Sequence, residues 1–137
     1  MRFEPVTLAP LLNAPLTTQL HATAALAALG LSANQLLGAK GIRPHRVLGS
    51  VWAVLMLGVA LSSFWIHGIR QFGDFSLIHL LSIVVLVNVP LAVWAAHQHN
   101  VRRHRTIMLS MFWLALVGAG LFTLAPGRIM HQVVFGP

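Results

Sequence analysis

Residues 75–96 read FSLIHLLSIVVLVNVPLAVWAA, and this stretch decides the fold. It contains no lysine, arginine, aspartate or glutamate, and apolar residues fill most of its length instead of forming one helical stripe. As an α-helix it would be about 33 Å long, enough to cross the roughly 30 Å hydrocarbon core of a bilayer. The stretch therefore predicts a helix that spans a membrane and contacts lipid.

Three other stretches share this character, and the composition of the whole chain agrees with it. Of the 137 residues, 57% are hydrophobic and 8% are charged, whereas about a quarter of the residues in a soluble domain are charged. A chain of this length forms one domain. We therefore predict an all-α, four-transmembrane-helix bundle in a single membrane domain, residues 1–137. Its expected parts are an N-terminal arm (1–15), helices at 16–37, 47–69, 75–96 and 107–124, and a C-terminal tail (125–137).

Lysine and arginine residues mark one side of the predicted bundle. Of the nine in the chain, six lie in the connections between helices one and two and between helices three and four: Lys40, Arg43, Arg46, Arg102, Arg103 and Arg105. The opposite side also holds both acidic residues, Glu4 and Asp74. Short loops rich in lysine and arginine stay in the cytoplasm, so both termini are expected to be extracytoplasmic in a multi-pass membrane protein. The net charge of +7 then reflects topology and attraction to the lipid bilayer, and it indicates no nucleic-acid partner.

The two predicted hairpins carry histidines at matching positions. His21 lies near the start of the first helix, and His45 opens the second. His79 lies near the start of the third helix, and His104 opens the fourth. This match predicts two repeated helical hairpins with two histidine pairs at equal depths. We call His21 and His79 the terminal pair, because they lie on the side of the chain termini, and His45 and His104 the loop pair.

Paired imidazoles on alternate helices suit a metal centre. Alternate helices of a four-helix bundle are diagonal neighbours, so their side chains can face each other across the core. Two facing imidazoles with apolar walls are what a b-type haem requires, and without cysteine the haem would be held non-covalently. All four paired histidines are therefore candidate metal ligands for one or two haem b groups. Arg46 and Arg105 could pair with haem propionates at the loop pair, and Ser82, near His79, is a further candidate cofactor-binding residue.

Each histidine also has a simpler interpretation. The loop pair stands among arginines at the headgroup level, where an imidazole can bind phosphate or water and no metal. The terminal pair lies deeper, and because ionisable groups inside a membrane are usually functional, the ligand interpretation is favoured there. His67 and His131 could replace either terminal ligand, while His97 and His99 are expected in a solvated loop.

Four sequence strings carry a resemblance to a known family. They are Lys40-Gly41 followed by His45-Arg46-x-x-Gly49, then Phe75-Ser76-x-x-His79-Leu80-Leu81-Ser82, His104-Arg105-x-x-Met108, and Gly118-Ala119-Gly120-x-Phe122-Thr123-x-x-Pro126-Gly127-Arg128. From His21 to Arg128 the chain resembles a bacterial family of four-span membrane proteins labelled as a domain of unknown function. That label implies no activity.

A looser resemblance concerns the order of the histidines over four successive helices. This order is similar to that of the di-haem membrane cytochromes b, which pass electrons between quinone, superoxide, ascorbate or iron on the two membrane faces. The similarity implies one haem at the terminal pair and another at the loop pair. The loop pair departs from that pattern because it lies closer to the helix ends than such ligands normally do.

These observations lead to three functional hypotheses. Both acids lie outside the predicted spans, which disfavours a carboxylate-driven pump or an acidic cation channel. The first hypothesis is a haem-binding membrane protein that relays electrons, with quinone or a partner redox protein. The second is a cofactor-free accessory subunit of a larger respiratory or photosynthetic membrane complex. The third is a quinone-binding membrane protein without haem, in which His79 and Ser82 would form hydrogen bonds to the quinone.

Overall fold

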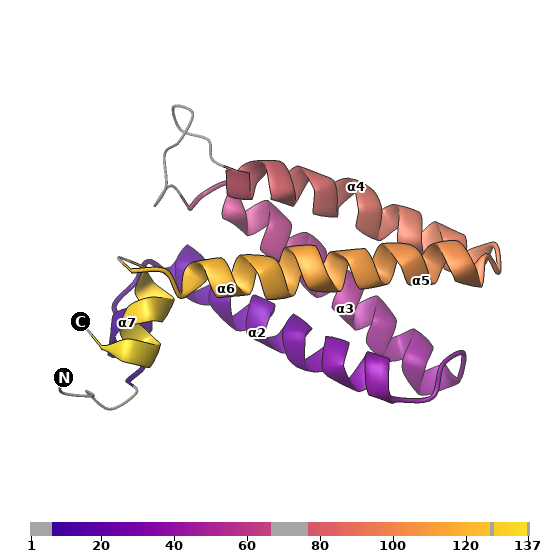
Figure 1. Ribbon diagram of the computed structural model, residues 1–137, viewed down its shortest axis with the longest axis horizontal. Coiled ribbons are helices and arrows are strands. Elements are labelled where there is room, and N and C mark those ends of the chain that lie inside the picture. Colours follow the sequence, from indigo (N-terminus) through magenta and orange to yellow (C-terminus); the bar gives the residue numbers. More distant parts are fainter. Residues whose placement is uncertain (1–6, 67–76, 127, 137) are drawn as a thin grey trace.

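A computed structural model of the chain describes residues 7–66, 77–126 and 128–136, with Leu77 and Ile78 described by their backbone only. Within these ranges every regular element is a helix, as predicted. The elements are α1 (Ala9–Leu12), α2 (Leu16–Leu37), α3 (Arg43–Ser63), α4 (Leu77–His97), α5 (Val101–Ser110), the π-helix η1 (Met111–Gly118), α6 (Ala119–Thr123) and α7 (Ile129–Phe135). Three of them, α5, η1 and α6, follow without a break and form one long rod (Figure 1).

The long helices form an antiparallel bundle. α2 packs along α3, α3 along α4 and α4 along α5, while η1 closes the bundle against both α2 and α4. In this order α2 is diagonal to α4, and α3 is diagonal to the rod. The α2–α3 and α4–α5 connections lie at one end, which we call the loop end, and α1 and α7 lie at the other, the terminal end (Figure 1). The chain thus forms two helical hairpins side by side, and their origin as a repeat stays a prediction.

Buried apolar side chains from the long helices fill the middle of the bundle. Trp52 and Met56 of α3 are only 2% and 1% exposed, and Met111 of η1 packs in the same cluster. Ala28 of α2 is fully buried there, since small residues let membrane helices approach closely. The indole N–H of Trp52 donates to the hydroxyl oxygen of Ser32 at 2.7 Å, so the polar atom of this buried ring is satisfied.

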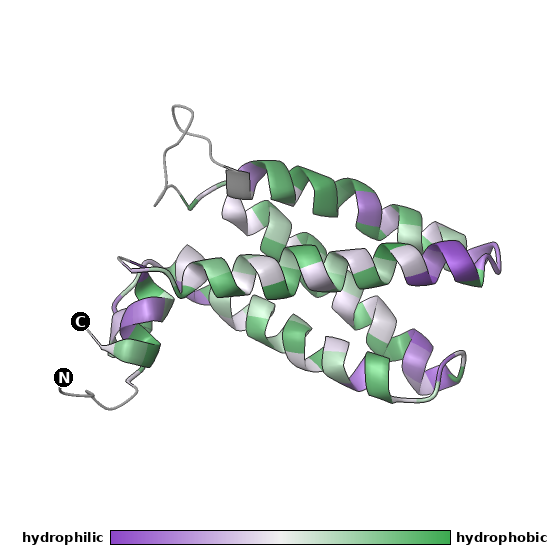
Figure 2. Cartoon of the chain, viewed as in Figure 1, coloured by the Kyte–Doolittle hydropathy of each residue, from purple (hydrophilic) through white to green (hydrophobic). Residues whose placement is uncertain are grey.

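Three helices of the described residues are long and apolar enough to cross a membrane: Arg43–Ser63, His79–His97 and Val101–Thr123. Large apolar side chains such as Val54 and Leu80 are exposed on their outer surfaces. Figure 2 shows that hydrophilic residues gather at the loop end, while apolar residues cover most of the middle of the bundle. Such surfaces suit lipid and would be a liability in water.

α2 is the exception among the long helices. It occupies Leu16–Leu37, as predicted, and is about 33 Å long, but it is not among the helices apolar enough to span. Gln19, His21, Asn34 and Gln35 lower its hydropathy. By length and composition, the structure therefore supports three of the four predicted spans.

The fourth long helix begins earlier than its apolar residues predict. It starts at Val101 instead of Ile107, because the side chain of Asn100 accepts a hydrogen bond from the backbone N–H of Arg103 at 3.2 Å. This bond satisfies one of the unpaired amides at the start of a helix. Hydropathy locates the part of a helix that contacts lipid, whereas the capping residue sets the position of the first helical residue.

α3 is shifted toward the loop end relative to the prediction. It begins at Arg43 instead of Val47, with Pro44 in its first turn, a position where the missing N–H of proline costs nothing. It ends at Ser63 instead of Ile69, and the last predicted residues of that helix lie outside the described ranges. Apolar residues continue past the helix end in turns, which is why hydropathy misplaces the boundary.

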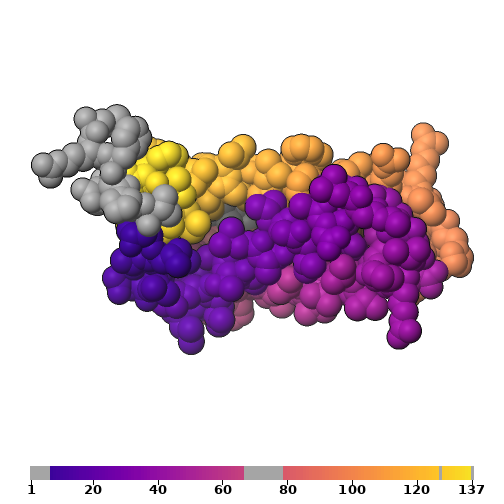
Figure 3. Space-filling view, turned by 90° about the horizontal axis from the view of Figure 1, so that it is seen from below, coloured from indigo at the N-terminus to yellow at the C-terminus, as the bar shows by residue number. Residues whose placement is uncertain are grey.

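Two short helices that the apolar pattern does not predict cover the terminal end. α1 packs against α7 (Figure 3), and the backbone N–H of Thr7 donates to the carbonyl of Val133 at 3.3 Å. The side-chain amide of Gln19 donates to the carbonyls of Leu12 and Ala14 at 3.0 and 2.8 Å. Both ends of the chain are therefore held at the same end of the bundle.

Candidate functional site

The loop pair comes together at the loop end of the bundle. His45 lies in the first turn of α3 and His104 near the start of α5, on diagonal helices. Both residues are half-buried, and the exposed Lys40 belongs to the same end of the bundle. Two histidines far apart in the sequence thus lie at the same end of the bundle, and their role as a ligand pair stays a prediction.

The ring of His104 is oriented by the neighbouring helix. Its Nδ1 lies 2.8 Å from the carbonyl oxygen of Ala92 in α4. A carbonyl oxygen can only accept, so Nδ1 carries the hydrogen, and in the neutral ring Nε2 keeps its lone pair. Metal-bound histidines commonly donate their other ring N–H to a backbone carbonyl in this way. The orientation of His104 therefore suits ligation through Nε2.

His45 has a buried ring nitrogen that the surrounding residues do not satisfy. Its Nδ1 is buried and finds no hydrogen-bond partner in the described part of the chain. The backbone carbonyl of the same residue accepts a hydrogen bond from the side-chain amide of Gln35 at 2.8 Å, which fastens the start of α3 to α2. Burying a polar atom without a partner costs roughly 1–3 kcal/mol. The ring of His45 therefore has one buried nitrogen whose hydrogen bond is missing among the described residues.

In the terminal pair, the ring of His21 is oriented by a serine on the adjacent helix. Nδ1 of His21 lies 2.8 Å from the hydroxyl oxygen of Ser62 in α3. The one hydroxyl hydrogen of Ser62 is donated to the carbonyl of Val59 at 3.0 Å, so Ser62 accepts from Nδ1–H of His21. As in His104, the neutral ring then keeps the Nε2 lone pair.

His79 is buried in the first turns of α4 and is only 3% exposed. Its ring packs against Phe64, with 5.6 Å between the ring centroids. Ser82, one turn further along α4, lies 2.5 Å from Ser63 through their hydroxyl oxygens. Ser63 also donates to the carbonyl of Ala60 at 2.7 Å.

These contacts connect the terminal pair across three helices. His21 of α2 binds Ser62, the adjacent Ser63 binds Ser82 of α4, and His79 lies one turn from Ser82. We call these five residues the terminal cluster. Ser62 and Ser63 are not among the site residues predicted from the sequence, although two successive serines in an apolar span could have indicated a polar cluster.

The remaining histidines have other surroundings. Nδ1 of His131 in α7 donates to the carbonyl of Leu124 at 2.7 Å, and its ring packs on Phe135 with 5.0 Å between centroids. His97 and His99 are exposed at the loop end, as expected. The predicted candidate His67 lies outside the described residues.

The predicted charged partners of the loop pair are exposed. Arg46 and Arg105 directly follow the two histidines and lie at the loop end. Glu4 and Asp74, the two acids of the chain, fall outside the described ranges. In the described ranges no three or more histidine, cysteine, aspartate or glutamate side chains gather to hold a metal ion.

The fold and these contacts define a helical membrane protein with a histidine pair at each end of its bundle. Over residues 18–135 the chain matches the family described as "Predicted membrane protein (DUF2306)", and it belongs to that family. The resemblance to a membrane protein family of unknown function is thereby confirmed. No curated protein and no solved structure matches the chain.

Proposed function

We propose that this protein binds haem between paired histidines and relays electrons in the membrane. The observation that carries the proposal is the loop pair, in which the Ala92 carbonyl leaves Nε2 of His104 available as a ligand and Nδ1 of His45 is buried without a partner in the described residues. Haem would supply one-electron redox chemistry when bound. The chain would supply axial ligands, burial and nearby positive charge, which tune the cofactor. Quinone or a partner redox protein would exchange the electrons.

The residues around the loop pair fit the needs of a haem. Nδ1 of His45 is buried and has no partner in the described residues, so it is a candidate ligand atom. Trp52 and Met56 lie two and three turns further along the same face of α3, where they pack in the apolar core of the bundle. Arg46 and Arg105 are exposed at the same end, where guanidinium groups can pair with propionates.

The terminal pair supports a second haem site. Ser62 takes the Nδ1 hydrogen of His21 and so leaves Nε2 to a ligand, and His79 is buried on the diagonal helix α4. Two haem groups at opposite ends of the bundle would form a path for electrons through the bilayer. This second site rests on the orientation of His21 and the depth of both rings.

We also propose that α2 is a fourth span. Its polar side chains bond to α3: His21 to Ser62, Ser32 to Trp52, and Gln35 to the backbone carbonyl of the His45 residue. A relatively polar helix can cross a bilayer when neighbouring helices satisfy its polar groups. With the basic loop end in the cytoplasm, both termini would be extracytoplasmic in a bacterial inner membrane.

A reduced-minus-oxidised visible spectrum of protein purified from haem-sufficient cells tests the proposal. A Soret band and a sharp α band on reduction are expected for two axial histidines. Colourless protein would refute haem binding. If that colourless protein co-purified in stoichiometric amounts with a large respiratory or photosynthetic complex, it would be an accessory subunit.

A second candidate function, quinone binding without haem, is favoured by the terminal cluster. The Ser63–Ser82 hydroxyl pair is buried beside His79, and hydroxyl and imidazole groups can donate to the carbonyl oxygens of a quinone. Quinone should then be found in organic extracts of the purified protein and be depleted by Ser82→Ala. Ser50→Ala, which changes an exposed serine of α3, is the matched control. Extracts free of quinone would exclude this function.

A further inference from the structure

The loop end carries positive charge that the chain does not balance. Of the nine lysine and arginine residues in the chain, six lie at this end, and all six are exposed: Lys40, Arg43, Arg46, Arg102, Arg103 and Arg105. The chain has only two acidic residues, Glu4 and Asp74, and both belong to segments that precede helices starting at the terminal end. Counter-charge for the loop end must therefore come from outside the chain.

The cations of the two connections at this end differ in whether they form hydrogen bonds to a helix terminus. In the α2–α3 connection, the ammonium of Lys40 donates to the carbonyls of Leu36 and Gly38 at 2.8 and 2.9 Å, so this cation closes the end of α2. In the α4–α5 connection, the neutral side chain of Asn100 caps the helix by accepting from the backbone N–H of Arg103. The guanidinium groups there are not needed for capping.

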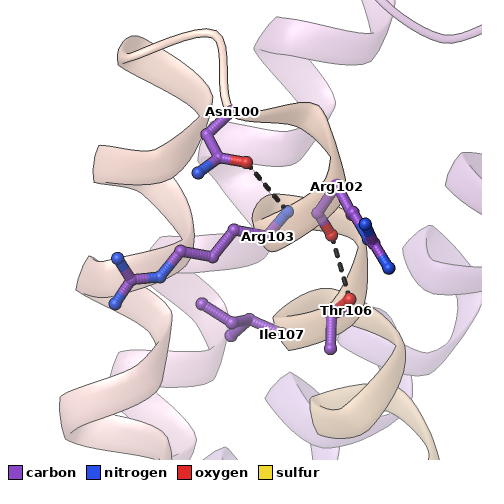
Figure 4. Close-up of a pocket in the computed structure, with 5 residues that line it drawn as sticks. All are labelled: Asn100, Arg102, Arg103, Thr106 and Ile107. Carbon is purple, nitrogen blue, oxygen red and sulfur yellow. Dashed lines mark hydrogen bonds between the residues drawn. The ribbon is translucent and has the colours of Figure 1, made fainter.

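An open notch lies at the start of α5. Its volume is about 360 Å³, and it is lined by Asn100, Arg102, Arg103, Thr106 and Ile107. Figure 4 shows the side chains of Arg102 and Arg103 extending on opposite sides, with Thr106 and Ile107 between them. The hydroxyl of Thr106 donates to the carbonyl of Arg102 at 2.9 Å. Positive charge thus flanks a notch that has one aliphatic wall.

We propose that this notch binds the phosphate of an anionic phospholipid headgroup. Guanidinium groups bind phosphate oxygens through charge-assisted, often bidentate hydrogen bonds. The notch lies at the end of Val101–Thr123, an apolar helix long enough to cross the membrane, and therefore at the level of the headgroups. Ile107 marks the start of the apolar part of that helix; it is half-buried, packs against the core of the bundle and lines the notch. An acidic protein segment would make no use of this apolar wall, so lipid is the better occupant.

The test compares two variants of equal charge. Arg102→Gln/Arg103→Gln removes the cations of the notch, while Lys40→Gln/Arg43→Gln removes two cations of the same end and keeps a side-chain donor at position 40. Full-length protein is placed in vesicles of phosphatidylcholine containing phosphatidylglycerol, then extracted in mild detergent, and the retained lipid is counted by native mass spectrometry. Circular dichroism confirms that each variant remains helical.

The wild type should retain phosphatidylglycerol in preference to phosphatidylcholine. Arg102→Gln/Arg103→Gln should lower that retention by about tenfold or more beyond the loss in the control, since it also removes charge-assisted hydrogen bonds to the phosphate. The control variant should lose far less. Equal losses in both variants would show that surface potential alone attracts lipid, and the notch would not be a site.

A third variant and two competitors separate lipid from other anions. Ile107→Ser should weaken retention of phosphatidylglycerol while leaving the weak competition by inorganic phosphate unchanged, because only the acyl contact is removed. If inorganic phosphate displaced the lipid at equal concentration, the site would be a free-phosphate site and the lipid assignment would be wrong. Preferential binding of a glutamate-rich peptide that Arg102→Gln/Arg103→Gln abolishes would likewise overturn it in favour of an acidic protein partner.

Discussion

The two ends of the bundle place their histidines in different surroundings. At the loop end, His45 and His104 lie near the starts of diagonal helices among exposed cations, and the backbone carbonyl of Ala92 orients the ring of His104. At the terminal end, His21 and His79 are connected through three serines on α3 and α4. Equal spacing in the sequence therefore leads to unequal sites in the fold.

This difference follows from what each end has available. The loop end lies at the start of two helices, where backbone amides are unpaired and charged residues can reach water. The terminal cluster lies further inside, where polar groups must find partners among their neighbours. Orientation is therefore supplied by a backbone carbonyl at one end and by hydroxyl groups at the other. If both pairs hold haem, the two centres should respond to different substitutions.

The largest expected effect is the selective loss of one centre. His104→Ala should remove all haem absorbance due to the loop pair and leave that of the terminal pair, and His21→Ala should do the reverse. The cause is the loss of an axial ligand, for which a methyl group offers no replacement. Visible and low-temperature EPR spectra of the purified variants distinguish the two centres.

His131→Ala is the matched control for this experiment, because His131 is a half-buried histidine bonded within the terminal end. It should leave both centres intact. If His104→Ala and His131→Ala had the same spectra as the wild type, the loop pair would not be a ligand pair.

The next effect concerns the orientation of His21. Ser62→Ala removes the acceptor of its Nδ1–H, and loss of such a partner typically lowers affinity at a metal-bound histidine by about 10–100-fold. Haem titration of apoprotein should show this weakening at the terminal pair alone. Ser50→Ala, on the exposed face of the same helix, should leave both affinities unchanged. Equal weakening of the two centres would show that Ser62 does not act on His21 alone.

The sequence predicts the helices better than it predicts the site. Continuous apolar stretches locate the four long helices, and α2 matches its predicted bounds at Leu16–Leu37. The start of α5 depends on one cap at Asn100, and capping is a local bond that hydropathy does not register. The π-helix at Met111–Gly118 is also invisible to it, because an i to i+5 pattern depends on backbone fit. At Gly118 an added Cβ would lie 3.3 Å from the carbonyl oxygen of Trp113.

The candidate site, too, can be predicted only in part: the histidines follow from the sequence, but the partners of their rings do not. Histidine spacing predicts which residues share a level, and His45 and His104 both lie near helix starts at the loop end. The partners that orient the rings come from other helices: Ala92 contributes a backbone atom, and Ser62 depends on how α3 is rotated. Neither backbone contacts nor helix rotation can be deduced from residue types in one sequence.

A smaller effect, shared by both ends, is expected in the middle of the bundle. Ser32→Ala leaves the indole N–H of Trp52 buried without its acceptor, which should lower the free energy of unfolding by roughly 1–3 kcal/mol. Denaturant titration in micelles, followed by circular dichroism, measures this loss. Ser50→Ala should stay within about 0.5 kcal/mol of the wild type. A Ser32→Ala variant as stable as this control would show that the bond does not hold α2 to α3.

The smallest effect is confined to the loop end. Asn100→Ala removes the cap of α5 and should cost about 1 kcal/mol, because the backbone N–H of Arg103 then depends on water for a partner. Asn100→Asp keeps a capping oxygen and should retain most of that stability. Hydrogen exchange should quicken in the first turn of α5 in Asn100→Ala and stay unchanged at the amides of α2 near His21. Faster exchange at both ends would mean that the bundle opens as one unit and that its two ends are not independent.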